Sequence, residues 1–151
     1  MNEVIKTDIC VIGAGSGGLS VAAGAVQMGA RVVLIEKGKM GGDCLNTGCI
    51  PSKALLAASH AASSARAASQ FGITTGPVLA NFAHVMDHVH SVIADIAPHD
   101  SIERFEKLGC TVIQAEARFT GPGEVIADGK RVQAKRFVIA TGSRASVPPI
   151  D

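Results

Sequence analysis

Hydrophobic and polar positions near the N-terminus form two apolar runs separated by a segment with helical character. Residues 8–15, DICVIGAG, are rich in β-branched residues and end in glycines, a pattern typical of a buried strand. Residues 16–29 predict a helix with Ala and Val on its buried face and Gly29 near its end. Residues 31–37, RVVLIEK, predict a second buried strand, so the three segments form a βαβ unit with parallel strands.

The middle of the chain is predicted to be mostly helical. A glycine-rich loop at residues 38–43 precedes a helix over residues 51–70, whose many alanines give it good helix propensity. Residues 81–97 and 99–108 predict two further helices, which Pro98 separates.

The last part of the chain reads as strands. Residues 111–121, TVIQAEARFTG, predict one strand, and residues 124–142 predict a hairpin that turns at Asp128-Gly129. The second arm of the hairpin continues into the apolar strand 136–142. The pattern as a whole predicts an α/β fold, a Rossmann-like domain with a parallel sheet, flanking helices and an antiparallel β-meander.

Composition fits one globular domain and argues against a nucleic-acid partner. The chain has 151 residues, of which 47% are hydrophobic and 18% charged. Its formal net charge is +1 and its aromatic content is 3%, whereas a nucleic-acid surface needs a basic face and usually stacking aromatic side chains. A small basic cluster belongs to the solvated side of the predicted hairpin: Lys130, Arg131, Lys135 and Arg136.

No membrane attachment is expected from the sequence. The longest apolar runs fall well short of the roughly 20 residues that cross a bilayer. The N-terminus lacks the basic region and small-residue cleavage site of a signal peptide. These features favour the cytoplasm, where a pair of cysteines is more often catalytic or metal-binding than structural.

A G-x-G-x-x-G motif formed by Gly13, Gly15 and Gly18 lies between the first predicted strand and helix. In this setting Gly13 allows the tight turn, Gly15 lets the backbone approach a pyrophosphate, and Gly18 lets the helix pack on the strand. The pyrophosphate would lie at the helix N-terminus, where free N–H groups favour an anion. Glu36, at the end of the next strand, would accept hydrogen bonds from an adenosine ribose. An ordinary tight turn is the alternative, but this context favours a dinucleotide site.

Two cysteines five positions apart, Cys44 and Cys49, occur in residues 41–55, GGDCLNTGCIPSKAL. They could form half of a metal site, lie in the core, or act as a redox pair. Zinc sites usually need a second Cys or His pair at a fixed spacing, which Cys110 and the five histidines do not provide. The flanking glycines and Asn46 indicate an exposed irregular turn instead of a core segment.

A redox pair accounts best for the surrounding residues. Pro51 suits the first position of a helix, which places Cys49 just before the helix N-terminus. The helix dipole, with Lys53 one turn further on, favours a thiolate there. A dithiol exchanges two electrons, and a dinucleotide bound upstream could carry the same two. The pair is therefore predicted to be a relay between cofactor and substrate.

The segments VIGAGSGG, IEK, GGDCLNTGCIPSKAL and ATGSRASVPPI give the whole chain a resemblance to a known family. The chain resembles the N-terminal FAD domain of the class I pyridine nucleotide-disulfide oxidoreductases, which include dihydrolipoyl dehydrogenase, glutathione reductase and mercuric reductase. The resemblance implies FAD at the glycine motif, with Ser16 on the pyrophosphate and Glu36 on the ribose. It also implies that Cys49 lies against the flavin as the charge-transfer thiolate, and that Cys44 is the interchange thiol that attacks the substrate.

The resemblance implies further cofactor contacts and reveals one departure. Lys53 would polarise the reactive edge of the flavin. Asp43 stands where the family commonly has Thr or Ser, and a carboxylate near a pyrophosphate is unfavourable unless it caps the helix or turns to solvent. The full set of expected cofactor-binding residues is Gly13, Gly15, Ser16, Gly18, Glu36, Lys37, Gly42, Asp43, Cys44, Lys53, Ala117, Thr141 and Gly142.

The predicted function of the complete enzyme is electron transfer between NAD(P)H, FAD and the Cys44–Cys49 disulfide. Dihydrolipoamide is the first expected substrate, because CLNTGCIPSKALL looks closest to the dihydrolipoyl dehydrogenase branch. Reduction of a metal ion, as in mercuric reductase, is the second. Two other interpretations are a non-catalytic FAD-binding module with a redox-sensing disulfide, and an NAD-binding Rossmann domain with an incidental cysteine pair.

The resemblance also predicts the domain organisation. Residues 1–151 are expected to be the N-terminal part of the FAD-binding domain of a longer enzyme, with the NAD(P)-binding and interface domains outside this chain. The full-length enzyme is expected to be a homodimer, and this chain alone is not expected to turn over.

The remaining histidines and cysteines are assigned no chemistry. His84 and His88 are one helical turn apart and beside Asp87, but we interpret them as an exposed helix edge. Cys10 and Cys110 are interpreted as buried small apolar residues of two strands. The sequence therefore predicts no metal site.

Overall fold

The computed structural model describes residues 4–144 and 146–150, and the chain divides into two units. Unit 1 comprises Met1–Gly42 and Asp100–Asp151, and unit 2 comprises Asp43–His99. All strands of the described chain belong to unit 1, so the predicted Rossmann-like sheet lies entirely within it.

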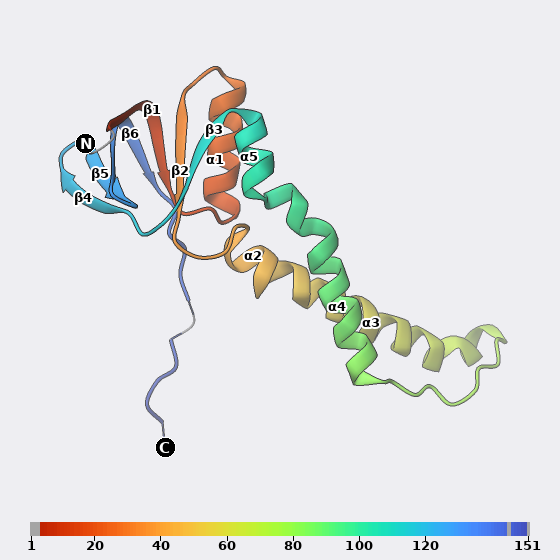
Figure 1. The fold of residues 1–151 in the computed structure, drawn as a ribbon. Coiled ribbons are helices and arrows are strands. Elements are labelled where there is room, and N and C mark those ends of the chain that lie inside the picture. The colour runs from red at the N-terminus through yellow and green to blue at the C-terminus, as the bar shows by residue number, and fades with distance from the viewer. Residues whose placement is uncertain (1–3, 145, 151) are drawn as a thin grey trace. The chain divides into compact units, whose positions relative to one another are not determined.

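Unit 1 contains one six-stranded sheet with the strand order β3-β2-β1-β6-β5-β4 (Figure 1). β3, β2, β1 and β6 are parallel neighbours, whereas β6, β5 and β4 form an antiparallel meander. This topology confirms the predicted α/β fold. The strands are β1 (Val4–Ile12), β2 (Val32–Glu36), β3 (Cys110–Gln114), β4 (Arg118–Gly121), β5 (Glu124–Ala127) and β6 (Lys130–Ile139).

Neighbouring side chains of a strand point to opposite faces of the sheet. The central strands have apolar residues at neighbouring positions, so apolar side chains cover both faces. Val11 and Leu34 belong to one buried cluster, whereas Cys10 and Val33 belong to a second. Burial raises the pKa of the Cys10 thiol to about 12, so this thiol stays protonated. Cys10 and Cys110 are both buried, as their positions in predicted strands indicated.

Helices α1 (Ser16–Gln27) and α5 (Ile102–Leu108) cover the first face of the sheet (Figure 1). Leu19 and Ala22 of α1 and Phe105 of α5 belong to the same buried cluster as Val11. The opposite face is covered by the meander, whose contribution to the second cluster is Val125, Ala127 and Val132.

The meander contains the predicted hairpin turn. Asp128 and Gly129 have positive φ angles of 50° and 68°, as the two central residues of a type I′ turn require. The two apolar segments predicted after this turn form one continuous strand, β6. Its first half pairs with β5, and along its length it pairs with β1.

The single strand predicted over residues 111–121 is wrong. The chain forms β3, leaves the sheet at residues 115–117, and then forms β4. β3 pairs with β2 at one edge of the sheet and β4 pairs with β5 at the other, so one straight strand could not occupy both places. Ala115 and Ala117 pack against the second cluster on the way.

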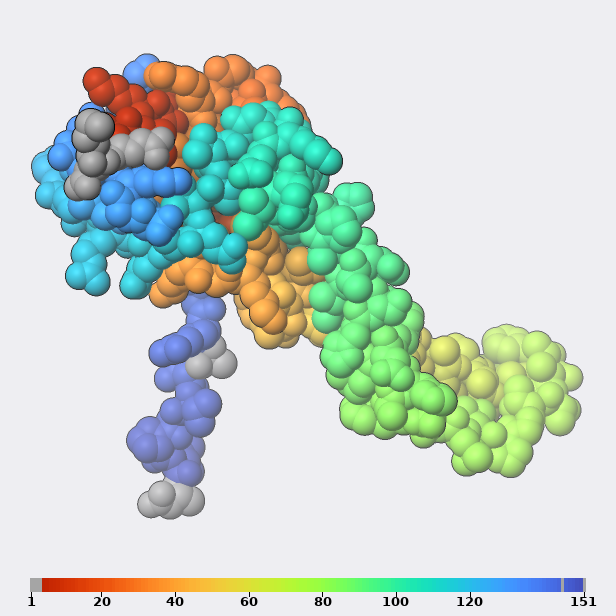
Figure 2. Space-filling view, in the orientation of Figure 1, coloured from red at the N-terminus to blue at the C-terminus, as the bar shows by residue number. Residues whose placement is uncertain are grey.

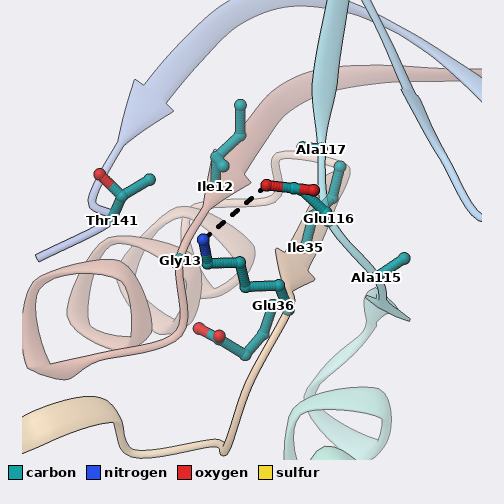
Figure 3. Close-up of a pocket in the computed structure, with 9 residues that line it drawn as sticks. Ile12, Gly13, Ile35, Glu36, Ala115, Glu116, Ala117 and Thr141 are labelled. Atoms are coloured by element: carbon teal, nitrogen blue, oxygen red, sulfur yellow. Dashed lines mark ion pairs between the residues drawn. The ribbon is translucent and has the colours of Figure 1, made fainter.

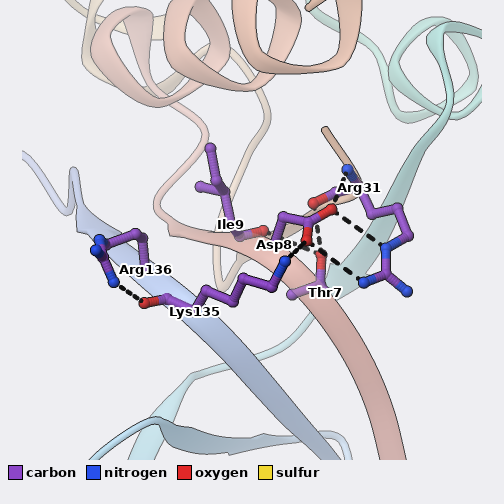
Figure 4. Close-up of polar contacts among 6 residues, drawn as sticks. All are labelled: Thr7, Asp8, Ile9, Arg31, Lys135 and Arg136. Atoms are coloured by element: carbon purple, nitrogen blue, oxygen red, sulfur yellow. Dashed lines mark hydrogen bonds and ion pairs between the residues drawn. The ribbon is translucent and has the colours of Figure 1, made fainter. Parts of the chain in front are cut away.

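A network of polar contacts joins β1 and β6 to Arg31, the residue before β2 (Figure 4). The Asp8 carboxylate pairs with the Arg31 guanidinium at 3.2 Å and with the Lys135 ammonium at 2.8 Å. The buried Thr7 hydroxyl donates to the Arg31 carbonyl at 2.7 Å. Lys135, which we assigned to the solvated side of the hairpin, therefore also ties the hairpin to β1.

Unit 2 is a helical hairpin with a short helix before it. It contains α2 (Gly42–Asn46) except its first residue, α3 (Cys49–Ala67), a 3₁₀ turn η1 (Ala68–Phe71) and α4 (Phe82–Ile96). α3 and α4 pack against each other, and Asn81 caps α4 by accepting from the N–H groups of Ala83 and His84 at 3.1 and 3.3 Å. Figure 2 shows α4 and the preceding loop of residues 72–81 at the surface.

Three helix boundaries differ from the predictions. Gly42 and Asp43 begin α2, although residues 38–43 were predicted to be loop. α3 begins at Cys49, with Gly48 as N-cap, so Pro51 is its third residue. Proline is tolerated there because N–H groups of the first helical turn have no acceptor within the helix. The helix predicted over residues 99–108 begins only at Ile102, after a second 3₁₀ turn, η2 (Ala97–Asp100), that includes Pro98.

Membrane-spanning character is absent from the part of the chain that the structure describes. None of its helices is both long and apolar enough to cross a bilayer.

Candidate functional site

The three motif glycines meet very different surroundings. A Cβ at Gly13 would collide with the backbone carbonyl of Ala140, and Gly13 has a φ of +105°. A Cβ at Gly18 would collide with the Gly13 carbonyl, so Gly18 permits the close helix–strand approach. A Cβ at Gly15 would meet only the Cα of Gly42, at 3.8 Å. Packing within unit 1 therefore accounts for glycine at positions 13 and 18, but it leaves space at position 15.

The N-terminus of α1 opens next to this space. Gly15 is the N-cap, and no side chain in the described chain forms a capping hydrogen bond with α1. The exposed Ser16 is the first residue of the helix. An uncapped helix N-terminus presents N–H groups and the positive end of the helix dipole, a combination that binds anions such as a pyrophosphate.

Glu36 connects the glycine turn to the loop that follows β2. Its Oε2 accepts a hydrogen bond from the Ala14 N–H at 2.6 Å, and its Oε1 accepts one from the Gly38 N–H at 2.6 Å. These contacts hold the carboxylate at the end of β2, beside the glycine turn, as predicted from its position in the sequence. Each carboxylate oxygen can accept a further hydrogen bond.

A cleft of about 110 Å³ lies at the carboxyl ends of the parallel strands (Figure 3). Ligands of open α/β sheets bind in this position. The cleft brings together several residues that are far apart in the sequence and were predicted to bind the cofactor: Gly13, Glu36, Lys37, Ala117 and Thr141. Ile12, Ile35, Ala115 and Glu116 also line it.

Glu116 was not predicted to be part of the site. Its carboxylate forms an ion pair with Lys37 at 3.8 Å across the cleft, where both side chains are largely exposed (Figure 3). The signal in the sequence was its place two residues after a strand of the parallel sheet, but the prediction of one continuous strand over 111–121 concealed the end of that strand. The predicted Gly142, with a φ of +68°, is exposed and does not line the cleft.

The two predicted redox cysteines both lie in unit 2. Cys44 is in α2 and Cys49 is the first residue of α3, so Cys49 lies inside the helix N-terminus and not just before it. Cys49 therefore lies at the positive end of the helix dipole. Both cysteines are free thiols, and Cys49 is exposed.

The environment distinguishes the two thiols. A hydrogen bond with Cys49 raises the pKa of the Cys44 thiol, and desolvation adds to this shift. The charge of Lys53 acts in the opposite direction and has a smaller effect. Cys44 therefore holds its proton more firmly than an ordinary cysteine.

Two predicted cofactor residues occupy the start of α2. Gly42 has a φ of +56°, and its Cβ position would lie 2.7 Å from the Cα of Gly15, so the two backbones approach closely. Asp43 is exposed, and its carboxylate accepts a hydrogen bond from the Thr47 hydroxyl. The aspartate that departs from the family pattern thus has a partner in the loop between the cysteines.

His84 and His88 are exposed on α4, as predicted. In residues 4–144 and 146–150, no group of three or more His, Cys, Asp and Glu side chains is arranged to hold a metal ion.

Comparison with known proteins identifies the relatives of this chain. The family described as pyridine nucleotide-disulphide oxidoreductase matches residues 7–151. The chain is 39% identical over 145 residues to dihydrolipoyl dehydrogenase of Staphylococcus aureus, covering 93% of this chain and 31% of that protein. It is 32% identical over 143 residues to mercuric reductase of Lysinibacillus sphaericus, covering 95% of this chain and 26% of that protein.

A solved structure has the same fold. The Cu(II) complex of the HOCl-induced flavoprotein disulfide reductase RclA from Escherichia coli superposes with a TM-score of 0.75 and 25% sequence identity. The match covers 95% of this chain and 29% of that one. The chain thus spans about a third or less of the length of the relatives it matches.

Proposed function

This chain belongs to the pyridine nucleotide-disulphide oxidoreductase family, and on that premise we propose that it is the N-terminal part of the FAD-binding domain of a disulfide oxidoreductase. The NAD(P)-binding and interface domains would lie outside residues 1–151. The complete enzyme would pass electrons between NAD(P)H, FAD and the Cys44–Cys49 pair. The similarity to a dihydrolipoyl dehydrogenase and to a flavoprotein disulfide reductase supports this proposal.

The observation that carries the proposal is the space at Gly15. Gly13 and Gly18 are glycines because protein atoms fill the place of a side chain, but at Gly15 the nearest atom to a Cβ is 3.8 Å away. This space adjoins the uncapped N-terminus of α1, where a pyrophosphate would find N–H donors. The residues at this turn therefore fit the pyrophosphate of a bound dinucleotide.

Several residues of the chain would hold FAD. The turn at Gly15 and Ser16 would bind the pyrophosphate, and Glu36 would accept hydrogen bonds from the ribose hydroxyls. Lys37, Ala117 and Thr141 would line the adenosine side of the cleft. When bound, FAD supplies two-electron transfer between a nicotinamide and a dithiol. Gly42, Asp43, Cys44, Lys53 and Gly142 remain predicted contacts of the cofactor.

The two cysteines would carry out thiol–disulfide exchange with the substrate. The Cys44 thiolate attacks one sulfur of a substrate disulfide, forming a mixed disulfide and releasing the first substrate thiolate. The Cys49 thiolate then attacks the Cys44 sulfur, which closes the Cys44–Cys49 disulfide and releases the second thiolate. Two electrons pass to the substrate, and two protons are taken up by its thiolates. Since the Cys44 pKa is raised, a base must accept its proton before the first attack.

The substrate we propose is a small disulfide or dithiol of the lipoyl type. The 39% identity to a dihydrolipoyl dehydrogenase supports this choice. The second candidate is reduction of a metal ion, which the 32% identity to a mercuric reductase supports. The full-length enzyme is proposed to be a cytoplasmic homodimer, since a reducing compartment keeps such a pair available for exchange.

The test is FAD binding by the chain and two single-glycine variants. We expect flavin fluorescence to show saturable binding to the wild type and at least about tenfold weaker binding to Gly15→Ala, because its methyl group would fill the space for the pyrophosphate. Gly24→Ala is the matched control, since Gly24 lies in the same helix with no atom near its Cβ position. Equal FAD affinity of Gly15→Ala and the wild type would refute the proposed cofactor site.

A further inference from the structure

The loop between the two cysteines is closed by Asp43. The Asp43 carbonyl accepts hydrogen bonds from the N–H groups of Thr47 at 2.9 Å and Gly48 at 2.6 Å. The Asp43 carboxylate accepts a third hydrogen bond, from the Thr47 hydroxyl. Asp43 immediately precedes Cys44 and Gly48 immediately precedes Cys49, so these contacts fix the two positions from which the cysteines project.

Gly48 packs closely against the carbonyl and the carboxylate of Asp43. A Cβ at position 48 would lie 3.0 Å from the Asp43 carbonyl oxygen and 3.2 Å from its Oδ2. Both distances are shorter than an ordinary van der Waals contact, so a larger residue would displace the Asp43 side chain. The conformation of the Asp43 side chain in this loop therefore depends on glycine at position 48.

We propose that Asp43 is a positioning residue that favours the Cys44–Cys49 disulfide over the dithiol. This inference rests on the proposed function, in which the two cysteines form a reversible disulfide. A loop whose ends are held together keeps the two sulfurs near each other and raises the effective concentration of one thiol at the other. The aspartate that replaces the Thr or Ser of the resembled family thereby makes the reduced pair a stronger reductant.

The measured quantity is the equilibrium constant of the pair against glutathione. Glutathione disulfide oxidises the two thiols, giving the Cys44–Cys49 disulfide and two molecules of glutathione, so two electrons and two protons are transferred. The 151-residue chain is equilibrated at fixed ratios of the two glutathione forms, quenched with acid and alkylated. Mass spectrometry then counts the free thiols at positions 44 and 49, while the buried Cys10 and Cys110 serve as internal references.

Removing either partner of the side-chain hydrogen bond is expected to shift this equilibrium toward the dithiol. Asp43→Ala removes the acceptor and Thr47→Val removes the donor in an isosteric way. Each should lower the equilibrium constant, by up to about fivefold, because the free-thiol loop would no longer be held in the geometry that brings the two cysteines together. Asp43→Asn keeps an oxygen that can accept from Thr47, so it should remain within about twofold of the wild type.

Asp87→Ala is the matched control, because it removes an exposed aspartate of the same unit from α4, outside the cysteine loop. Circular dichroism identifies any variant that does not fold. Asp43→Ala and Thr47→Val remove the same side-chain hydrogen bond independently, one from each partner. Wild-type values in both variants would overturn the role of Asp43 while leaving the proposed function intact. If the wild type forms no Cys44–Cys49 disulfide at any glutathione ratio, the proposed function itself fails, and the inference fails with it.

Discussion

At the scale of single residues, Asp8 shows how one carboxylate connects three strands. Its side chain, 26% exposed, contacts the guanidinium and backbone N–H of Arg31 in addition to the ammonium of Lys135. The hydrogen bond from the Arg31 side chain is the main reason that the pKa of Asp8 lies far below its ordinary value, followed by the contact with Lys135. The ionised form of Asp8 is therefore the one that the folded chain stabilises.

The sign of the pH effect follows from this lowered pKa. The pKa of an unfolded Asp is about 3.9. The stabilisation by ionised Asp8 is therefore complete above that pH, and it is lost as the pH falls through the folded-state pKa. We predict that Asp8→Asn lowers the urea midpoint at pH 7 and that its difference from the wild type narrows below about pH 4. Urea unfolding followed by circular dichroism at pH 7, 4 and 3 measures this. A constant difference across the three pH values would show that the charge of Asp8 is unimportant.

At the scale of elements, one glycine inside α1 and one glycine just after it have opposite roles. Gly29 follows the helix with a φ of +83°, and its N–H and that of Ala30 bond to the carbonyls of Val26 and Ala25. This pattern is a Schellman motif, in which glycine tolerates the left-handed conformation. Gly24 lies inside the helix, and its φ is not in the left-handed range.

Replacing Gly24 and Gly29 by alanine separates these roles, because neither Cβ position has a heavy atom within 4 Å. Gly24→Ala should stabilise the chain by about 0.5–1 kcal/mol, since alanine has the higher helix propensity. Gly29→Ala should destabilise it by about 1–2 kcal/mol, the cost of a left-handed alanine. Urea unfolding of the two variants gives both free energies. Changes of the same sign would mean that packing, and not backbone conformation, determines both positions.

The elements that could be predicted from the sequence are those with strong local signals. β1 and β2 contain apolar runs, α1 between them is rich in Ala and Val, and all three are followed closely by glycines. Asp128-Gly129 supplies the φ angles of its own turn. The break after β3 has no such signal, because the alanines at 115 and 117 look compatible with a strand. Only the opposite positions of β3 and β4 in the sheet require the break.

The candidate site could likewise be predicted only where a local sequence motif determines it. The close packing at Gly13 and Gly18 and the place of Glu36 at the end of β2 follow from a motif whose spacing reflects local packing. The ion pair of Lys37 with Glu116 and the hydrogen bond of Asp43 with Thr47 depend on how loops fold in space, so they required a structure. The start of α3 was predicted wrongly from Pro51, because proline is compatible with several positions of a first helical turn.

At the scale of the whole molecule, burial differs between the two units. In the described chain, the buried apolar residues of unit 2 are Leu45, Ala54 and Val89, whereas unit 1 has the two extensive clusters of its sheet. Large apolar side chains of unit 2 are exposed instead: Leu55, Leu56, Phe71, Ile73, Leu79 and Phe82. Burial of apolar surface is the dominant stabilising term in folding, so unit 2 holds less of the stability of the chain.

Amide hydrogen exchange should reveal this difference directly. Local opening is easiest where few apolar contacts must be broken, so we predict that amides in the middle of α3 and α4 exchange at least about 100-fold faster than those of β1 and β2. Mass spectrometry of peptic fragments over residues 52–66 and 84–94, compared with fragments of β1 and β2, measures the ratio. In the complete homodimeric enzyme that we propose, added protein surface should slow exchange in α3 and α4 more than in the sheet. Equal protection of both units in the 151-residue chain would show instead that the α3–α4 hairpin unfolds only together with the sheet.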